Sequence, residues 1–453
     1  MSNMTSQQRK LVYLCGILLL LIPIIKLGLP SDTAGNGGDL ARLRTMYELG
    51  EADLGEVDPS GAAMNLVLLG MRGIAVNLLF SKFEKERDAH QWYEMAATTE
   101  SMVKLQPHFE KVWEQNGWNL AYNTSAEWDA VADRYRWVKA GGLFLKRGVL
   151  QNRKSTQLQY HVANIYQKKI GIADEAKFYR NFFLHDPDPK FDNGPDPAFN
   201  PDILDNYLVA KKEYKRACEI EDTEHRPQHV LDRSLFRSMP ARCQFDYASA
   251  LQKDGKFGEE TREAWQEALS DWTAKYGQEV FSVPVGELGT NVRFDIRMEM
   301  TRDDIKREVS NPDDVPRVIK IVDQYRKMVN YYYWTMRGNC ESEPVTSEAH
   351  RNLYEASQNY KNQKMEAARD SAFAGMKGFE EILRMPEYSD LKSEDTLVEE
   401  CLLGIMVWKD VYELAQTKVP TDYPLKWLEA EYQGNASIQS NVKRAFKRQF
   451  ITD

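Results

Sequence analysis

The stretch "LQPHFEKVWEQNGWNLAYN", Leu105–Asn123, carries the pattern that decides the fold. Pro107 ends one predicted helix, and the next helix places Trp113 and Gly117 four residues apart, so both lie on the same helical face. A glycine at this position lets a neighbouring helix approach closely, while the tryptophan fills the space beside it. We therefore predict that the tryptophans of this region pack between helices rather than line a ligand site. These tryptophans are Trp113, Trp118, Trp128 and Trp137.

A second segment near the C-terminus shows the same use of small residues. In "EAHRNLYEASQNYKNQKMEAARDSAFAGMKGFEEILRMP", Ala356 is followed by Ala368, Ala372 and Gly375, and Pro386 closes the segment. Small residues at these intervals are what two antiparallel helices need in order to interlock. The segment therefore predicts a helical hairpin.

These motifs resemble the tetratricopeptide repeat, in which a helix after a proline carries a tryptophan-like position and a glycine four residues later. The chain also resembles a group of large bacterial proteins with an N-terminal anchor, repeat-like helices and no characterised function. The similarity rests on "LLGMRGIAVNLL", on "LQPHFEKVWEQNGWNLAYN" and on the Ala356–Pro386 hairpin, and spans most of residues 60–390. It implies an all-α fold: a solenoid of stacked antiparallel helical hairpins with degenerate repeats, preceded by one N-terminal transmembrane helix. It implies no reaction.

Helical patterns dominate the rest of the chain, with long helices predicted at Val315–Asn339 and Thr396–Gln416. Strand-like alternation is best at Glu279–Met300, where we expect a short hairpin or an extended loop. The apolar stretch Ala62–Phe80 has Arg72 at its centre, and a charge there would cost at least ~2.5 kcal/mol inside a bilayer. We predict a buried helix for this stretch, with a re-entrant or membrane-lying helix as the alternative.

The N-terminus predicts a membrane anchor. Leu11–Ile25 is uncharged, and with Lys26 reaching the headgroups the segment to Leu29 is long enough to cross a bilayer. A cleaved secretory signal is the alternative, but no good small-x-small cleavage site follows. Because Arg9 and Lys10 precede the span, we expect a single-pass protein of the inner (cytoplasmic) membrane, with most of the chain on the extracytoplasmic, periplasmic side.

Composition shifts divide the chain into five predicted parts. These are a cytoplasmic tail and transmembrane anchor at 1–30, a flexible tether at 31–40, an N-terminal helical domain at 41–185, a Pro/Asp-rich linker at 186–202 and a C-terminal helical-repeat domain at 203–453. The tether is rich in small and polar residues, and the prolines of the linker cannot continue a helix.

The sequence contains no phosphate loop, dinucleotide fingerprint, nucleophile elbow or zinc motif. Four aspartates of the linker could give calcium its oxygen ligands, but Lys190 and Phe191 stand where a calcium loop needs a ligand and a glycine, so a solvated linker is favoured. These aspartates are Asp186, Asp188, Asp192 and Asp196. His225 and His229 have the spacing of two metal ligands on a helix, but Pro227 opens that helix, and surface histidines are favoured.

The cysteines leave two alternatives open. Cys15 belongs to the predicted anchor. The other four form either two local disulfides, Cys218–Cys243 and Cys340–Cys401, or four buried thiols.

The C-terminal "NVKRAFKRQF" also has two interpretations. Val442, Phe446 and Phe450 recur every four residues among lysines and arginines, which is typical of a basic amphipathic helix on anionic lipid or an acidic partner. Because the segment is short, a frayed and solvated tail is favoured.

The formal net charge of −9 argues against a nucleic-acid-binding protein. The leading hypothesis is a membrane-anchored helical-repeat scaffold, not an enzyme and without cofactor or metal, that binds a protein or peptide partner on the extracytoplasmic side and meets the bilayer through its N-terminal helix. An all-helical glycan-binding protein or glycan-active enzyme is the alternative, since sugars stack on aromatic rings. A purely structural element of the envelope is a third. The binding residues are expected on the concave face of the repeats, but the sequence does not identify them.

Overall fold

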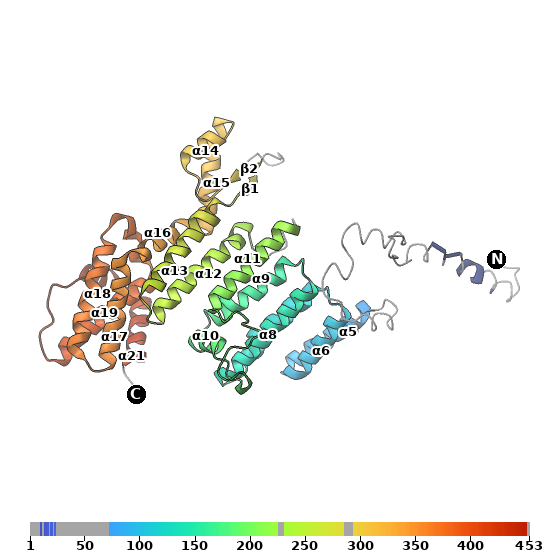
Figure 1. The fold of residues 1–453 in the computed structure, drawn as a ribbon, viewed down its shortest axis with the longest axis horizontal. Coiled ribbons are helices and arrows are strands. Elements are labelled where there is room, and N and C mark those ends of the chain that lie inside the picture. The colour runs from blue at the N-terminus through green and yellow to red at the C-terminus, as the bar shows by residue number, and fades with distance from the viewer. Residues whose placement is uncertain are drawn as a thin grey trace. The chain divides into compact units, whose positions relative to one another are not determined.

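The computed structural model describes residues 72–224, 231–284 and 293–450, together with scattered positions between 10 and 23. Over these residues the chain is mostly helical, with one two-stranded sheet (Figure 1). The prediction of an all-α fold is therefore confirmed for the part of the chain that the structure describes.

The chain divides into two compact units. The first comprises Met1–Pro201 and Glu219–Gln228, and the second comprises Asp202–Cys218 and His229–Asp453. Helix α11, Asn206–Glu224, contributes residues to both. The predicted linker, residues 186–202, lies almost wholly in the first unit, and Phe199 and Asn200 near its end are buried.

Helices of the first unit pack as neighbours along the chain. Their bounds are α5 Arg72–Asp88, α6 Trp92–Leu105, α7 Glu110–Trp118, α8 Val131–Gln151, α9 Thr156–Asn164 and α10 Ala176–Leu184. Two π-helical turns, η1 Asn119–Thr124 and η2 Ile165–Ile170, continue α7 and α9, and a 3-10 turn, η3, covers Pro189–Phe191. Each helix from α5 to α9 contacts the next (Figure 1).

The predicted close approach at Gly117 is confirmed. A Cβ atom added to Gly117 would lie 2.4 Å from Leu145 Cγ of α8, and one added to Gly141 would lie 2.5 Å from the carbonyl oxygen of Gly117. Trp113 fills the space beside this contact and packs on Gly148. The glycines therefore set the distance between α7 and α8.

The tryptophans of this region do not all pack between helices. Trp113 and Trp137 are buried and Trp128 is partly buried, so the prediction is confirmed for the first two. It is wrong for Trp118, which is 47% exposed. Five residues after Trp113, this side chain is rotated by about 140° around the helix from the face that contacts α8.

The second unit contains the longer series of helices. Before its sheet lie α12 Arg233–Lys253, α13 Glu259–Ser270 and the turns η4 Asp271–Lys275 (π) and η5 Tyr276–Gln278 (3-10). After the sheet come α14 Arg302–Glu308, η6 Pro312–Asp314, α15 Val315–Met328, α16 Tyr331–Ser342, α17 Pro344–Lys361, α18 Met365–Leu383, η7 Pro386–Ser393, α19 Asp395–Leu414, α20 Lys426–Tyr432 and α21 Ala436–Phe450.

Two sequence predictions can be compared with the structure here: the hairpin at Glu279–Met300 and the single helix at Val315–Asn339. Strands β1 Phe281–Pro284 and β2 Arg293–Ile296 pair antiparallel, with Phe281 opposite Ile296, so the predicted short hairpin is confirmed. The single helix predicted at Val315–Asn339 is wrong. Asn330 adopts φ 55° and separates α15 from α16, a conformation that asparagine tolerates better than most residues.

The predicted helical hairpin is formed by α17 and α18. Ala356, Ala368 and Ala372 are buried at the contact, and α18 ends just before Pro386, as expected. A Cβ atom on Gly375 would lie 2.7 Å from Leu353 Cδ2 and 3.0 Å from the carbonyl oxygen of Ala349. Small residues thus hold the two helices close together.

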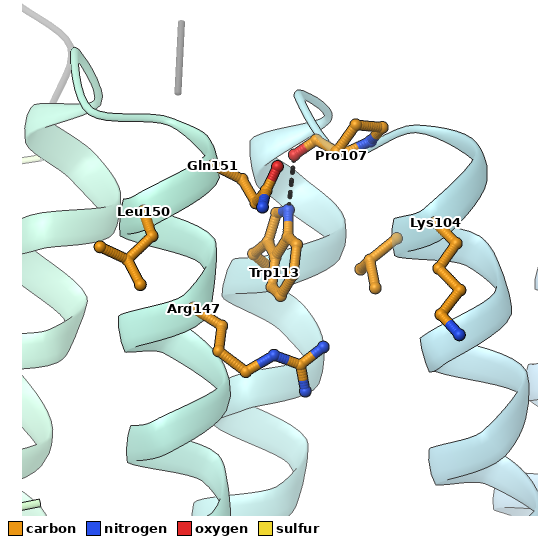
Figure 2. Close-up of a pocket in the computed structure, with 7 residues that line it drawn as sticks. Lys104, Pro107, Trp113, Arg147, Leu150 and Gln151 are labelled. Carbon is orange, nitrogen blue, oxygen red and sulfur yellow. Dashed lines mark hydrogen bonds between the residues drawn. The ribbon is translucent and has the colours of Figure 1, made fainter. Parts of the chain in front are cut away.

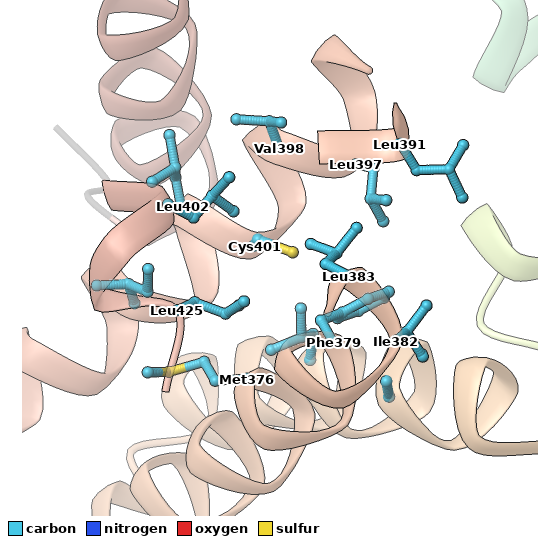
Figure 3. Close-up of a cluster of buried hydrophobic side chains, with 14 of the residues drawn as sticks. Met376, Phe379, Ile382, Leu383, Leu391, Leu397, Val398, Cys401, Leu402 and Leu425 are labelled. Atoms are coloured by element: carbon cyan, nitrogen blue, oxygen red, sulfur yellow. The ribbon is translucent and has the colours of Figure 1, made fainter. Parts of the chain in front are cut away.

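A hydrophobic core extends from this hairpin to α19. Phe379 and Ile382 of α18 belong to the same cluster as Val398 and Cys401 of α19, and all four are fully buried (Figure 3). Leu425 joins them from the segment before α20. Long apolar side chains on these elements therefore stabilise the C-terminal half of the second unit.

We predict that Gly375→Ala lowers the free energy of unfolding of the second unit by about 1–3 kcal/mol, because the added methyl overpacks the contact with Leu353 and Ala349. A helical glycine in open space, Gly73 of α5, is the matched control. Nothing lies within 4 Å of its added Cβ atom, so Gly73→Ala should raise stability by up to about 1 kcal/mol. Calorimetric unfolding of both variants checks the opposite signs, and a stabilised Gly375→Ala variant would contradict the close packing.

The described part of the apolar stretch Ala62–Phe80 belongs to α5. Val76 and Phe83 are buried, whereas Ile74 and Leu78 are 56% and 68% exposed. The prediction of a buried helix is therefore wrong for this part, because the described residues cover only one side of α5. Residues 62–71 and the side chain of Arg72 lie outside what the structure describes.

Most of the predicted anchor, Leu11–Leu29, also lies outside the described residues. Within the residues that are described, no helix combines the length and the apolar composition needed to span a membrane.

Candidate functional site

An exposed aromatic pair lies on α7 and η1. The rings of Trp118 and Tyr122 stack with their centroids 5.1 Å apart and their planes 16° from parallel. Glu114, four residues before Trp118, continues the same strip along the helix. Tyr122 is partly buried, and this burial, with the nearby charge of Tyr160, raises the pKa of its hydroxyl to about 12. The pair offers a large ring surface with a neutral hydroxyl.

A polar group from α9 lies beside the start of this strip. His161 Nε2 lies 3.0 Å from Glu114 Oε1, and the ammonium of Lys111 lies 2.5 Å from Glu114 Oε2. The hydrogen bond from His161, reinforced by Lys111 and opposed by burial, lowers the pKa of Glu114 to about 2. Glu114 is therefore an anion at neutral pH whose charge is already neutralised by its neighbours.

Lys169 of η2 lies beside the other end of the strip. Its ammonium nitrogen sits 4.9 Å from the ring centroid of Tyr122 and 6.0 Å from that of Tyr179, both within cation–π distance. Burial is the largest cause of a lowered pKa for this ammonium. The nearby Glu175 is paired with Arg134, and among the described residues Lys169 has no ion pair of its own. We call Glu114, Trp118, Tyr122, His161 and Lys169 together the α7–α9 face.

The two elements that build this face have the same construction. In each, nine residues of α-helix are followed by six residues of π-helix, beginning at Glu110 and at Thr156. π-Helical turns are rare and occur often at functional sites. The starts of the two elements lie further apart than the roughly 34 residues of the tetratricopeptide repeat, and their residues are not alike.

A separate pocket of about 170 Å³ opens beside α6 and α8 (Figure 2). It is lined by Val103, Lys104, Pro107, Trp113, Arg147, Leu150 and Gln151. The indole nitrogen of Trp113 donates a hydrogen bond of 2.7 Å to the carbonyl of Pro107, and Arg147 forms a two-pronged ion pair with Glu100 at 2.7 and 2.8 Å. No carboxylate lines this pocket, so it lacks the pair of acids that glycoside hydrolysis needs.

The aspartates of the predicted linker are held by an internal cation. The ammonium of Lys139 in α8 lies 2.6 Å from Asp186 Oδ2 and 3.1 Å from Asp196 Oδ2, and all three side chains are nearly inaccessible. The solvated-linker prediction is therefore wrong for Asp186 and Asp196, while Asp192 is exposed. The ammonium group of Lys139 thus lies between these two carboxylates, where a calcium ion would have to bind.

The histidine pair His225 and His229 lies outside the described residues. Among the residues that are described, no group of three or more His, Cys, Asp or Glu side chains is arranged to hold a metal ion.

The cysteines outside the predicted anchor are buried thiols. Cys218, Cys243, Cys340 and Cys401 are all buried, and none of them is joined in a disulfide, so the disulfide alternative is wrong and the buried-thiol alternative is confirmed. Burial raises the pKa of the Cys340 thiol to about 12 and that of Cys401 well above its ordinary value. Neither thiol has the thiolate character of a nucleophile.

The C-terminal segment is a packed helix, α21, rather than a frayed tail. Val442 and Phe446 are buried, which overturns the favoured prediction. Because these side chains are covered by the protein itself, the apolar side of this helix does not face outward, and the alternative of a contact with anionic lipid or an acidic partner stays a prediction.

Comparisons with known proteins give no relative: no family model matches the chain, and neither the curated proteins nor the solved structures include a match. The α7–α9 face is therefore interpreted from its own chemistry.

Proposed function

We propose that this protein is a membrane-anchored helical-repeat scaffold of the tetratricopeptide type, which binds a protein or peptide partner on the extracytoplasmic side. The α7–α9 face is the proposed binding surface, and the predicted span Leu11–Leu29 is the proposed anchor. The role is binding, without catalysis and without a cofactor. The observation that carries the proposal is the exposed Trp118–Tyr122 stack beside the cation of Lys169.

The residue types on this face support recognition of a protein. Tryptophan and tyrosine are enriched among the side chains that dominate binding energy, because they bury a large rigid area at low cost in conformational entropy. Trp118 supplies such an area, and Tyr122 supports it from one side. A partner should therefore place an apolar or aromatic side chain on the free surface of Trp118.

The charge at Lys169 adds a second requirement for the partner. This half-buried ammonium faces aromatic rings, and no ion pair among the described residues neutralises it. A carboxylate of the partner would complete a charge-assisted contact there. The expected ligand is thus a segment with an apolar side chain and a nearby acidic residue.

The arrangement of the helices agrees with this proposal. In stacked helical repeats, the extended concave surface used for binding is made by repeated units. The first helices of successive pairs, α7 and α9, both contribute to the α7–α9 face. The paired construction of α7–η1 and α9–η2 supports a repeat origin for this surface.

We predict that Trp118→Ala weakens partner binding by about 30-fold or more, because truncating a central aromatic anchor commonly costs about 2 kcal/mol or more. The full-length chain would carry a photoreactive phenylalanine analogue at Asn123, which is exposed next to the face, and would be cross-linked in its own membranes. One cross-linked species should appear and should be lost in Trp118→Ala and reduced in Lys169→Gln.

The matched control is Tyr93→Ala, which truncates another aromatic side chain, 67% exposed, on α6. This variant should keep the cross-link. A species captured equally well by wild type and by Trp118→Ala would show that the face does not bind the partner, and the proposal would then fail.

A glycan ligand is the second candidate, because the exposed ring of Trp118 also suits stacking against a sugar. This candidate predicts that adding oligosaccharides of the cell envelope to the full chain shifts the tryptophan fluorescence. The shift should be absent in Trp118→Ala. If the wild-type chain gives this fluorescence shift but forms no cross-link to a protein, the glycan alternative is favoured.

A further inference from the structure

Helix α21 is fixed to the second unit through its apolar side. Ile438, Val442 and Phe446 are buried, and α21 packs against α17 and α19. The ring of Tyr360 on α17 contacts Phe446 and Phe450, with centroids 5.8 and 4.8 Å apart. The orientation of the helix about its own axis is therefore set by packing.

The opposite side of α21 carries only cations and polar groups. Lys443, Arg444, Lys447 and Arg448 are all exposed, and at 100° per residue they lie within one half of the helix circumference. We call these four residues the basic face. Lys361, at the end of α17, is exposed as well, and its ammonium lies 5.9 Å from the ring of Phe450.

Within the described part of the chain, the cations of the basic face have no carboxylate partner. Arg444 donates only to Ser440 and Asn441, at 3.5 and 3.4 Å, and helix α21 contains no acidic residue. The chain as a whole is acidic, with a formal net charge of −9. An unpaired row of positive charge on an acidic protein indicates an anionic partner.

We propose that the basic face binds the headgroups of anionic phospholipids at the surface of the bilayer. Clusters of four to eight lysines and arginines on one helix are typical of such contacts, each cation contributing roughly fivefold to binding. A protein partner is less suited to this surface, because the aromatic side chains that would anchor an interface point inward to Tyr360. The inference uses the proposed anchor, which would keep α21 near a membrane, but not the α7–α9 face.

The contact would be peripheral and sensitive to salt. Because the apolar side of α21 is already buried in the second unit, only the charged side chains would reach the membrane. Such an interaction decays over about 10 Å at 0.1 M salt and about 3 Å at 1 M salt.

The test uses the full-length chain in vesicles, with a fluorophore placed on the basic face. Ser440 is exposed between the cations, and Cys15→Ser with Ser440→Cys leaves one reactive thiol, since the other four cysteines are buried. A quencher on the lipid headgroups then reports contact. We expect strong quenching in phosphatidylglycerol-containing vesicles, weak quenching in pure phosphatidylcholine, and loss of the difference at about 1 M salt.

The decisive variant replaces all four cations of the basic face by glutamine. It should reduce the ratio of membrane-bound to free states by at least about 100-fold, while an unchanged thermal transition shows that α21 stays packed. The matched control changes the charge equally at other exposed sites and should keep the quenching. It carries glutamine at Lys253, Lys377, Lys392 and Lys418.

Two outcomes would overturn the proposal. In one, quenching is the same in both kinds of vesicle or survives in the four-glutamine variant. In the other, the label never meets lipid, yet the wild-type chain binds soluble polyglutamate and the variant does not, which would assign the basic face to an acidic protein. Neither outcome bears on the cross-link at Asn123, so failure here and failure of the proposed partner binding are separable.

Discussion

Lys139→Met is expected to lower the free energy of unfolding of the first unit by about 3–5 kcal/mol, because it leaves two buried carboxylates without their cation. Asp186 and Asp196 approach Lys139 from opposite ends of one loop, at 2.6 and 3.1 Å. The ring of Phe191, 4.7 Å from the ammonium, covers the site from the same loop. The loop therefore depends on one buried charge of α8.

Calorimetry of the full chain measures this loss, which corresponds to a downward shift of roughly 10 °C in the transition of the first unit. The control is Lys190→Met in the same loop, where the ion pair with Asp188 is largely exposed. An exposed ion pair contributes little to stability, so this control should lose much less. A loss for Lys139→Met that equals the control would show that the buried pair does not hold the loop.

Some of the fold could be predicted because its cause is local in sequence. Gly117 lies four residues after Trp113, and Ala368, Ala372 and Gly375 recur along one side of α18, so the residues that permit close helix packing are visible as a periodic pattern. The hairpin of β1 and β2 could likewise be predicted, from the alternation of apolar and polar residues in this segment. In each case one short segment contains the whole signal.

The buried ion pairs could not be predicted, because their partners are distant. In the sequence, Lys139 looks like an ordinary solvent-exposed lysine of a helix. It is buried because the loop that carries Asp186 and Asp196 packs over it. The exposed position of Trp118 has a similar origin, since it depends on which side of α7 is covered by α8. Burial of a polar group and exposure of an aromatic one are both decided by tertiary contacts.

The α7–α9 face could not be predicted either, because it too depends on tertiary contacts. Tyr122 and Lys169 come from different helices, and their proximity follows from the packing of η1 near η2. The break at Asn330 shows a further limit. The apolar pattern continues through it, and a single residue with positive φ separates two helices that the sequence joins.

A second buried charge network holds the helices of the second unit together. Glu341 of α16 is 1% exposed, forms an ion pair with Arg337 at 2.7 Å, and accepts hydrogen bonds from Gln252 at 2.8 Å and from His350 at 3.2 Å. The other ring nitrogen of His350 lies 2.8 Å from Glu400 of α19. With a carboxylate on each side, the imidazole is held as a cation that connects α16, α17 and α19.

The pKa values of this network define its pH range. Burial disfavours the charged form of His350, but the charges of Glu400 and Glu341 outweigh it and raise the pKa to about 10. Burial likewise opposes ionisation of Glu341, but Arg337 and His350 outweigh it and lower the pKa to about 2. The histidine thus stabilises the fold fully below its ordinary pKa of 6.5, and the contribution is lost as pH rises through about 10.

We therefore expect His350→Leu to lower the free energy of unfolding of the second unit by about 3–5 kcal/mol near pH 6, because Glu341 and Glu400 lose the cation between them. The difference from wild type should shrink progressively between pH 6.5 and about 10, since the wild-type imidazolium itself loses its proton over that range. His185→Leu, at an exposed ring whose Nδ1 faces the carbonyl of Asn193 at 3.0 Å, is the matched control and should show a much smaller loss. Urea unfolding of both variants from pH 6 to 10 checks the profile. If the loss for His350→Leu stays constant across that range, the imidazole is neutral in the folded protein, and the helices are joined there by packing and ordinary hydrogen bonds rather than by a buried charge.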